Sequence, residues 1–466
     1  MIDTAEKECL LANIRRLAST LNALESRSGG PLIFYGPSRH LVVSGQDGTM
    51  AKSYRNHERF NDEIANLVAF GEINDVRGKL LEEINGPDGT YIGLPTINPA
   101  FDLSRFDPKS QNGAPLISIY STITGDSLYD MTIKGTATFE DYIKAAVQIA
   151  RIQQEGKIHK EKLGLEDVVK KARTQGEKDT DYFVRRRFQE VFLKQLTEYG
   201  EVQIPHPQQQ LMSIDWETLV AENLVRTHLR GNNGYYFDGN PRHHIYDGDR
   251  RNVVSFDFEY KKYVPALLGL ASLLSFGLTK DGNPYLGLEE QTKILDRFLL
   301  EIEFANALHG KARDKTKRIA EYIKNRKEVY NSDLSGQDSE EFFRFLDIYD
   351  DKERGATERR EFLSGWQFAL LDRNAAWLGH KARYRAVAEF LLGENLFREM
   401  GIKFDIEDPV RQNAVEQRMH LDNILSVLDD LQQKTTIKNG RSTQDAAKRL
   451  YYNFGELTAH PYFSLR

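Results

Sequence analysis

The chain has 466 residues. A single ordinary hydrophobic core accommodates fewer residues, so this length predicts two or three domains. Its 63 basic and 69 acidic residues give a net charge of −6, so the composition carries no signature of a nucleic-acid-binding protein. Cys9 is the only cysteine, which excludes intramolecular disulfides and thiolate metal clusters and fits a reducing cytosol.

Neither a leader nor a membrane-spanning segment is expected from the sequence. Residues 1–14 lack a basic stretch followed by an apolar one, so no signal peptide is expected. The most apolar run, residues 264–278, is short for a bilayer and contains serine and glycine, which is typical of a buried helix. We therefore expect a soluble cytoplasmic protein with no membrane partner.

The first third of the chain alternates short strand-like runs with helical segments. Apolar residues at helical spacing predict an amphipathic helix over residues 5–25, and a second helix is expected over 58–72. Strands bounded by Gly and Asp turns are expected at 31–36, 40–45, 49–54, 91–94 and 115–121. These elements predict a small sheet that carries one helix.

From Thr138 onward the pattern is mainly helical. A β-like segment interrupts it at residues 233–258, and at least four helices are expected beyond residue 285, including 384–400 and 415–431. The basic run Arg185-Arg186-Arg187 is more typical of a solvated surface than of a site.

Several segments offer the groups that phosphoryl transfer needs: a cation for the phosphates, oxygen ligands for Mg²⁺ and a group that orients the acceptor. Lys52 lies in a predicted strand after the turn Gln46-Asp47-Gly48, and Glu63 follows eleven residues later on a predicted helix, with Glu58 as the alternative. Asp257 stands in a Ser-Phe-Asp-Phe-Glu-Tyr string after a β-branched strand. Taken singly, each of these residues is more often a surface charge.

In this order, residues from about 30 to 285 resemble the kinase-like phosphotransferase superfamily of choline and ethanolamine kinases and aminoglycoside phosphotransferases. The resemblance implies an α+β, bilobal protein-kinase-like fold: a small antiparallel β-lobe, a helical C-lobe and an extended α-helical C-terminal region. The implied divisions are 1–29, an N-terminal helix; 30–130, the N-lobe; 131–285, the C-lobe core; and 286–466, the helical extension.

The resemblance also implies ATP and Mg²⁺ as cofactors. Lys52 would contact the phosphates with Glu63 as its partner. Backbone groups of Ile119 and Tyr120 would hold the adenine, where an apolar strand runs into a turn; an ordinary core strand is the alternative. Asp257 would ligate Mg²⁺, with Glu259 assisting.

The catalytic loop departs from the kinase pattern His-x-Asp-x-x-x-x-Asn. In residues 226–233, Arg-Thr-His-Leu-Arg-Gly-Asn-Asn, taking Asn233 as the metal ligand puts His228 at the position of the catalytic Asp. An imidazole can act as a general base, although His228 is alternatively a structural histidine. A second candidate, residues 244–249, is more typical of a strand and turn, and a metal site built on His243 and His244 lacks a third ligand.

Two functions follow. The first is an ATP- and Mg²⁺-dependent phosphotransferase that acts on a small-molecule hydroxyl. The alternative is a pseudokinase, a nucleotide-binding or scaffold module whose C-terminal helices bind a protein partner, because the catalytic carboxylate is missing. A nucleic-acid partner is not expected.

Overall fold

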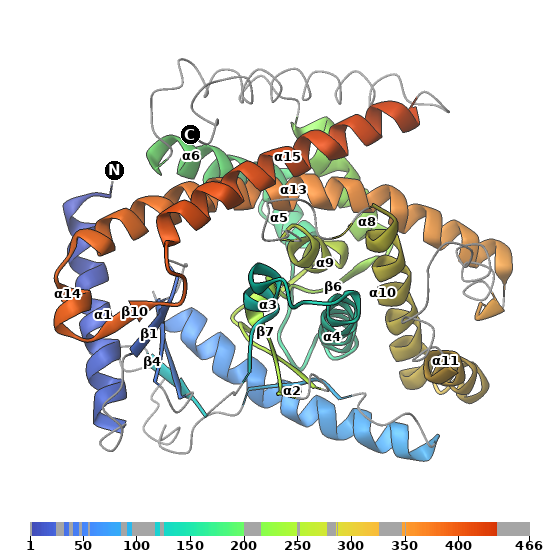
Figure 1. The fold of residues 1–466 in the computed structure, drawn as a ribbon. Helices are drawn as coiled ribbons and strands as arrows, with labels where there is room; N and C mark the ends of the chain where they lie inside the picture. Colours follow the sequence, from blue (N-terminus) through green and yellow to red (C-terminus); the bar gives the residue numbers. More distant parts are fainter. Residues whose placement is uncertain are drawn as a thin grey trace.

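The computed structural model is a mixed α+β structure in which helices predominate, and this confirms the predicted class (Figure 1). No described helix combines the length and the apolar character that crossing a membrane requires. The structure describes residues 2–24, 32–36, 41–45, 49–54, 56–84, 91–95, 117–121, 125–199, 216–248, 252–276, 286, 288–325, 347–349 and 351–435.

A five-stranded sheet forms the smaller part of the molecule, in the order β10-β1-β2-β3-β4. The strands are β1 (Leu32–Tyr35), β2 (Leu41–Ser44), β3 (Met50–Ser53), β4 (Ile117–Tyr120) and β10 (Ile402–Phe404). β1 to β4 pair antiparallel, as predicted, whereas β10 pairs parallel to β1. The C-terminal region, predicted as helical, therefore adds an edge strand to this sheet.

Two helices accompany the sheet. α1 (Thr4–Leu24) packs on β2 and β3, and its buried leucines share a core with Val43 and Ala51. α2 (His57–Glu83) follows Asn56, whose side chain accepts a hydrogen bond from the amide of Arg59 and so caps the helix. Residues 91–94, predicted as a strand, form none, because the Asn74 side chain takes both backbone bonds of Ile92.

The larger part of the molecule is helical and contains two small sheets. One pairs β5 (Glu166–Asp167), β9 (Lys262–Pro265) and β6 (Asn233–Tyr235); the other pairs β7 (His244–Tyr246) and β8 (Val253–Ser255). The described helices of this part before residue 286 are α3 (Leu128–Lys134), α4 (Phe139–Ile158), α5 (Val168–Thr174), α6 (Lys194–Tyr199), α8 (Glu222–Leu229) and α9 (Leu267–Leu274), with the π-helices η2 (Tyr182–Leu193) and η3 (Glu217–Ala221) and the 3₁₀-helix η4 (Pro241–His243).

The C-terminal region packs against both other parts. Its helices are α10 (Leu288–His309), α11 (Arg313–Asn325), α13 (Lys352–Gly393), α14 (Leu396–Glu399) and α15 (Pro409–Thr435). α13 and α15 lie side by side across the molecule in Figure 1, and α13 also packs on η2, α6 and α9. α10 packs along α4. The apolar core is consequently continuous from α4 through α9 to α13.

Arg187 joins η2 to α13 through a buried ion pair. Its Nε lies 2.9 and 2.7 Å from the two carboxylate oxygens of Asp372, whose side chain is fully buried. The sequence predicts that the run Arg185-Arg186-Arg187 lies on the surface. Of the three side chains, only that of Arg186, which is 57% exposed, lies clearly there.

Replacing Arg187 with alanine should lower the free energy of unfolding by about 3–5 kcal/mol, because Asp372 would remain buried without its cation. Urea unfolding of the full chain measures this loss. The neighbouring replacement Arg186→Ala is the matched control and should change stability by less than about 0.5 kcal/mol. Equal effects of the two replacements would contradict the assigned role of the Arg187–Asp372 pair.

Candidate active site

A cavity of about 730 Å³ lies between the five-stranded sheet and the helical part. β1, β2 and β3 line one side, the segment between β6 and β9 lines another, and η2 and α13 close it. Its lining includes the charged groups Lys52, Glu63, Asp238, Asp257 and Glu259.

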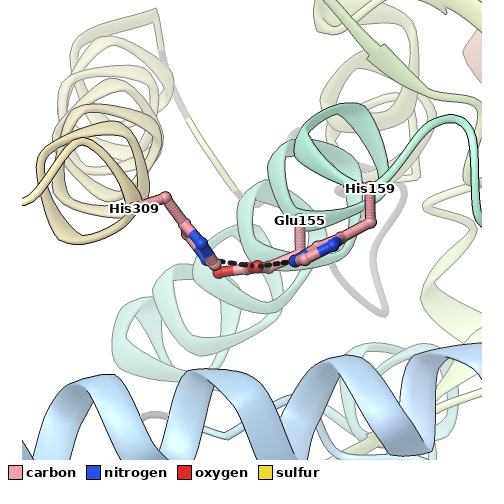
Figure 2. Close-up of side chains that lie close together, drawn as sticks. All are labelled: Glu155, His159 and His309. Atoms are coloured by element: carbon pink, nitrogen blue, oxygen red, sulfur yellow. Dashed lines mark hydrogen bonds and ion pairs between the residues drawn. The ribbon is translucent and has the colours of Figure 1, made fainter.

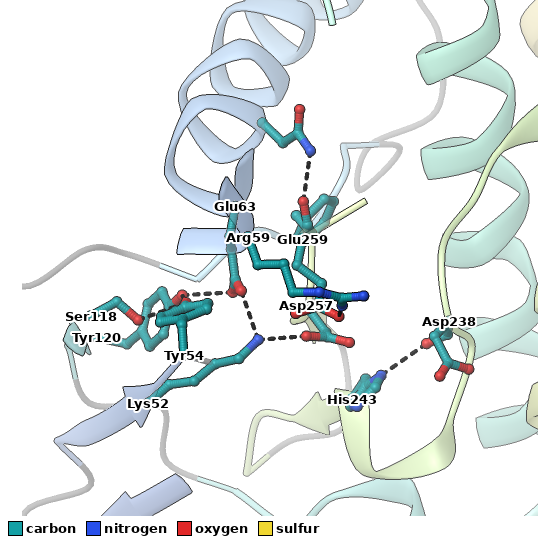
Figure 3. A network of polar contacts seen from close by, with 12 residues as sticks. Lys52, Tyr54, Arg59, Glu63, Ser118, Tyr120, Asp238, His243, Asp257 and Glu259 are labelled. Carbon is teal, nitrogen blue, oxygen red and sulfur yellow. Dashed lines mark hydrogen bonds and ion pairs between the residues drawn. The ribbon is translucent and has the colours of Figure 1, made fainter. Parts of the chain in front are cut away.

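Lys52 points from β3 into this cavity because side chains alternate along a strand: Ala51 faces the α1 core and Lys52 the other side. Its Nζ lies 2.6 Å from Glu63 Oε2 and 2.5 Å from Asp257 Oδ1 (Figure 3). Burial disfavours the ammonium form of Lys52 and so acts to lower its pKa. The negative charges of Asp257 and Glu63 have the larger effect and raise the pKa of Lys52 well above its usual value. The ion pair expected between Lys52 and Glu63 is present.

The same alternation separates Ile119 from Tyr120. The Tyr120 hydroxyl donates to Glu63 Oε1 at 2.6 Å and contacts the Tyr54 hydroxyl at 3.0 Å. Burial and the nearby Glu63 charge raise the pKa of Tyr120 well above its usual value, so the hydroxyl remains a donor. The Ile119 side chain instead packs in the core that the α1 leucines share, and Ile119 is not among the residues that line the cavity.

Helix α2 fixes the segment that carries Asp257. Arg59, Glu63 and Asn66 follow one another at helical spacing and share one face of the helix. Arg59 forms an ion pair with Glu259, and Asn66 Nδ2 donates to the carbonyl oxygens of Phe258 at 2.6 Å and Tyr260 at 3.0 Å. The three residues that follow Asp257 are thus tied to the helix that positions Glu63.

Asp257 has a left-handed backbone conformation, with φ of 73°. Aspartate tolerates this region better than most residues, yet such positions persist only where surrounding contacts impose them and they cluster at functional sites. The bend lies two residues after β8 and turns the carboxylate toward Lys52 (Figure 3).

Glu63, Asp257 and Glu259 form a cluster of buried carboxylates. One oxygen of each lies within 4.8 Å of one oxygen of each of the others. An all-oxygen donor set at the wall of a cavity fits a hard divalent cation such as Mg²⁺, which takes one or two carboxylates from the protein together with phosphate oxygens.

Asp238 is a cavity residue that the sequence analysis missed. It lies in the loop between β6 and η4, is 8% exposed, and its Oδ1 accepts a hydrogen bond from Arg373 Nη2 on α13 at 3.3 Å. Its backbone carbonyl accepts from His243 Nδ1 at 2.8 Å (Figure 3). Because a carbonyl only accepts, the neutral His243 ring has its lone pair on Nε2.

The structure places His228 and Asn233 outside the cavity, away from the groups they were expected to join. His228, on α8, is 2% exposed, and its Nε2 lies 2.9 Å from Asp167 Oδ1. Asn233 begins β6 and donates to the backbone oxygen of His228 at 2.8 Å. Both side chains serve the packing of this small sheet, which corrects the expected arrangement of the catalytic loop.

The signal that could have found Asp238 is the Asp-x-x-x-x-Asn spacing with histidine in place of the asparagine. His243 stands five residues after Asp238, and Asp257 comes two residues after the end of β8, the strand that pairs with β7. A motif with asparagine at that position matches Asn233 instead.

No known family model and no curated protein matches the chain. Among solved structures, an ethanolamine kinase from Plasmodium vivax is similar, with a TM-score of 0.35 and 12% sequence identity. The alignment covers 85% of this chain and 82% of that chain.

Proposed function

We propose that the protein is an ATP-dependent phosphotransferase with a bilobal, kinase-like arrangement, which requires a divalent cation and acts on a small-molecule hydroxyl. The observation that carries the proposal is Lys52 held between Glu63 and Asp257 in a cavity that Asp238 also lines. Kinases need these groups, and they need them in this chain order: strand Lys, helix Glu, loop Asp and metal-binding Asp.

In this proposal Lys52 binds nucleotide phosphates, and Glu63 keeps its ammonium group in place. Asp257 and Glu259 hold Mg²⁺, which would neutralise charge on the phosphates. The adenine lies beside β4, against the backbone of Ile119 and Tyr120.

Asp238 is the proposed general base in place of His228. A buried carboxylate can orient an acceptor hydroxyl and accept its proton, and Arg373 fixes the rotamer of Asp238 from α13. His243 takes the position proposed for Asn233 as the second metal ligand, since its Nε2 carries a lone pair. The pseudokinase alternative rested on a missing carboxylate, and Asp238 removes that reason.

The wall beyond Asp238 supports a small-molecule acceptor. Arg242, Trp377, Lys381 and Tyr384 line it, and three of these residues come from α13. Lys381 is paired with Glu416, and Arg242 lies 2.5 Å from Asp405, so the wall is an ordered set of charges and rings.

Millimolar ATP with Mg²⁺ should raise the melting temperature of the protein, because a ligand that binds only the native state stabilises it. Differential scanning fluorimetry measures the shift, with ATP alone and Mg²⁺ alone as controls. An acceptor is then sought by following transfer of labelled γ-phosphate to a pool of hydroxylated metabolites. No thermal shift at millimolar ATP in either condition would overturn the proposal.

A further inference from the structure

A second cluster of ligating side chains lies where α4 and α10 end side by side, away from the cavity. Glu155 and His159 are one helical turn apart at the end of α4, and His309 is the last residue of α10. Figure 2 shows the two imidazole rings approaching the Glu155 carboxylate from either side. None of the three residues lines the cavity described above.

The three ligand atoms converge on one point. His309 Nε2 lies 2.8 Å from Glu155 Oε2, and His159 Nε2 lies 3.8 Å from the same oxygen, too far for a hydrogen bond. One ligand atom from each residue lies within 4.8 Å of those of the other two. Within the described chain, His159 Nε2 is buried and has no hydrogen-bond partner. A buried imidazole nitrogen aimed at a carboxylate without bonding it is a costly arrangement unless something lies between them.

We propose that Glu155, His159 and His309 bind a Zn²⁺ ion, which ties α4 to α10. Two imidazoles and one carboxylate are a ligand set that zinc uses with a fourth, exchangeable ligand, and zinc–nitrogen and zinc–oxygen distances of about 2.0–2.2 Å need only a small outward shift of these side chains. The single carboxylate excludes Mg²⁺ and Ca²⁺ as preferred occupants, because they require more oxygen ligands.

A neighbouring arginine holds the Glu155 carboxylate in a fixed orientation, which suits a metal ligand. Arg77, fully buried on α2, binds the other oxygen of Glu155 and so fixes its orientation, as second-sphere partners of metal ligands do. Arg77 is shared with Glu301 on α10, whose carboxylate lies 3.2 Å from its Nη2, so the guanidinium charge does not fall on Glu155 alone.

Burial and neighbouring groups shift the pKa values of two of the three residues. Burial raises the pKa of Glu155, but the hydrogen bond from His309 and the charge of Arg77 outweigh it and leave that pKa below its usual value. Burial lowers the pKa of His159, although Glu155 opposes the shift.

The site is open enough for exchange. The side chains of His159 and His309 are 22% and 14% exposed, whereas that of Glu155 is fully buried. An ion would therefore reach the two imidazoles from solvent and meet the carboxylate behind them. It would stabilise the contact between the helical core and the first helix of the C-terminal region, whether or not the protein transfers phosphate.

The test is zinc content and affinity of the untagged full chain. After incubation with Zn²⁺ and dialysis, mass spectrometry should find one equivalent of zinc per chain, and Co²⁺ in its place should give the visible absorption of a tetrahedral site. His309→Ala and His159→Ala should each lower zinc affinity by more than about 100-fold, since even second-sphere changes cost 10–100-fold.

His57→Ala, at the start of α2, is the matched control and should keep the full zinc content. Circular dichroism of each variant establishes that it is folded. Absence of bound zinc in the folded wild-type protein would overturn the proposal. Undiminished binding by both His159→Ala and His309→Ala would overturn it too, and would direct attention to the carboxylates beside Lys52.

Discussion

Replacing Asp238 with asparagine should lower the rate of phosphoryl transfer by roughly 10²–10⁴-fold, the usual contribution of a general base. ATP affinity should change little, because Asp238 is proposed to act on the acceptor and not on the nucleotide. The asparagine oxygen can still accept from Arg373, so the loop should keep its conformation. Initial rates of γ-phosphate transfer, with ATP binding measured in parallel by thermal shift, separate the two effects.

The replacement His228→Ala is the contrasting variant, because the sequence alone predicts His228, and not Asp238, as the catalytic base. His228 is buried against Asp167 and lies outside the cavity, so its loss should lower stability and leave the transfer rate per folded molecule near the wild-type value. If His228→Ala abolishes transfer in folded protein while Asp238→Asn retains it, the assignment of the base is wrong.

The parts of the site that could be predicted are those with local signals. A lysine on a strand after a turn, a glutamate on the next helix and an aspartate after a buried strand each carry their structural context in neighbouring residues. Lys52, Glu63 and Asp257 accordingly meet in space. The antiparallel order of the first four strands followed from the same short-range pattern.

Other features depend on residues distant in sequence and leave no local signal. β10 pairs with β1, although most of the sequence separates the two strands. An edge strand has unpaired backbone groups, and only the folding of the chain brings a partner strand to it. Arg187 stands in a basic run that is typical of a solvated surface, yet its side chain is buried because it pairs with Asp372 on α13. Asp238 was missed for another reason: its expected partner, asparagine, is a histidine here.

The C-terminal region belongs to the site in this arrangement. Arg373 on α13 holds the Asp238 carboxylate, Trp377 and Lys381 on the same helix line the cavity, and β10 extends the sheet that carries Lys52. Because α13 lines the cavity and binds the proposed base, the packing of α13 on α15 helps to position Asp238.

Asp257→Asn should abolish the Mg²⁺-dependent part of the stabilisation by ATP and leave the Mg²⁺-independent part. An amide keeps the size of the side chain but loses the negative charge that a hard cation requires. Lys52→Ala should instead weaken ATP binding with or without Mg²⁺, because it removes the phosphate-binding cation. Its own melting temperature should also fall, since Glu63 and Asp257 then lie buried without the ammonium group that separates them.

Thermal-shift titrations of ATP, with Mg²⁺ and with a chelator, resolve these two patterns in the same instrument. Lys261→Ala is the matched control, because Lys261 is 38% exposed and pairs with Asp62 outside the cavity. It should bind ATP as the wild type does, since exposed ion pairs contribute little. If Asp257→Asn keeps a full Mg²⁺-dependent shift, the metal does not bind at the Glu63–Asp257–Glu259 cluster. If Lys52→Ala binds ATP with undiminished affinity, the nucleotide phosphates lie elsewhere, and the phosphotransferase proposal loses the contact on which it is built.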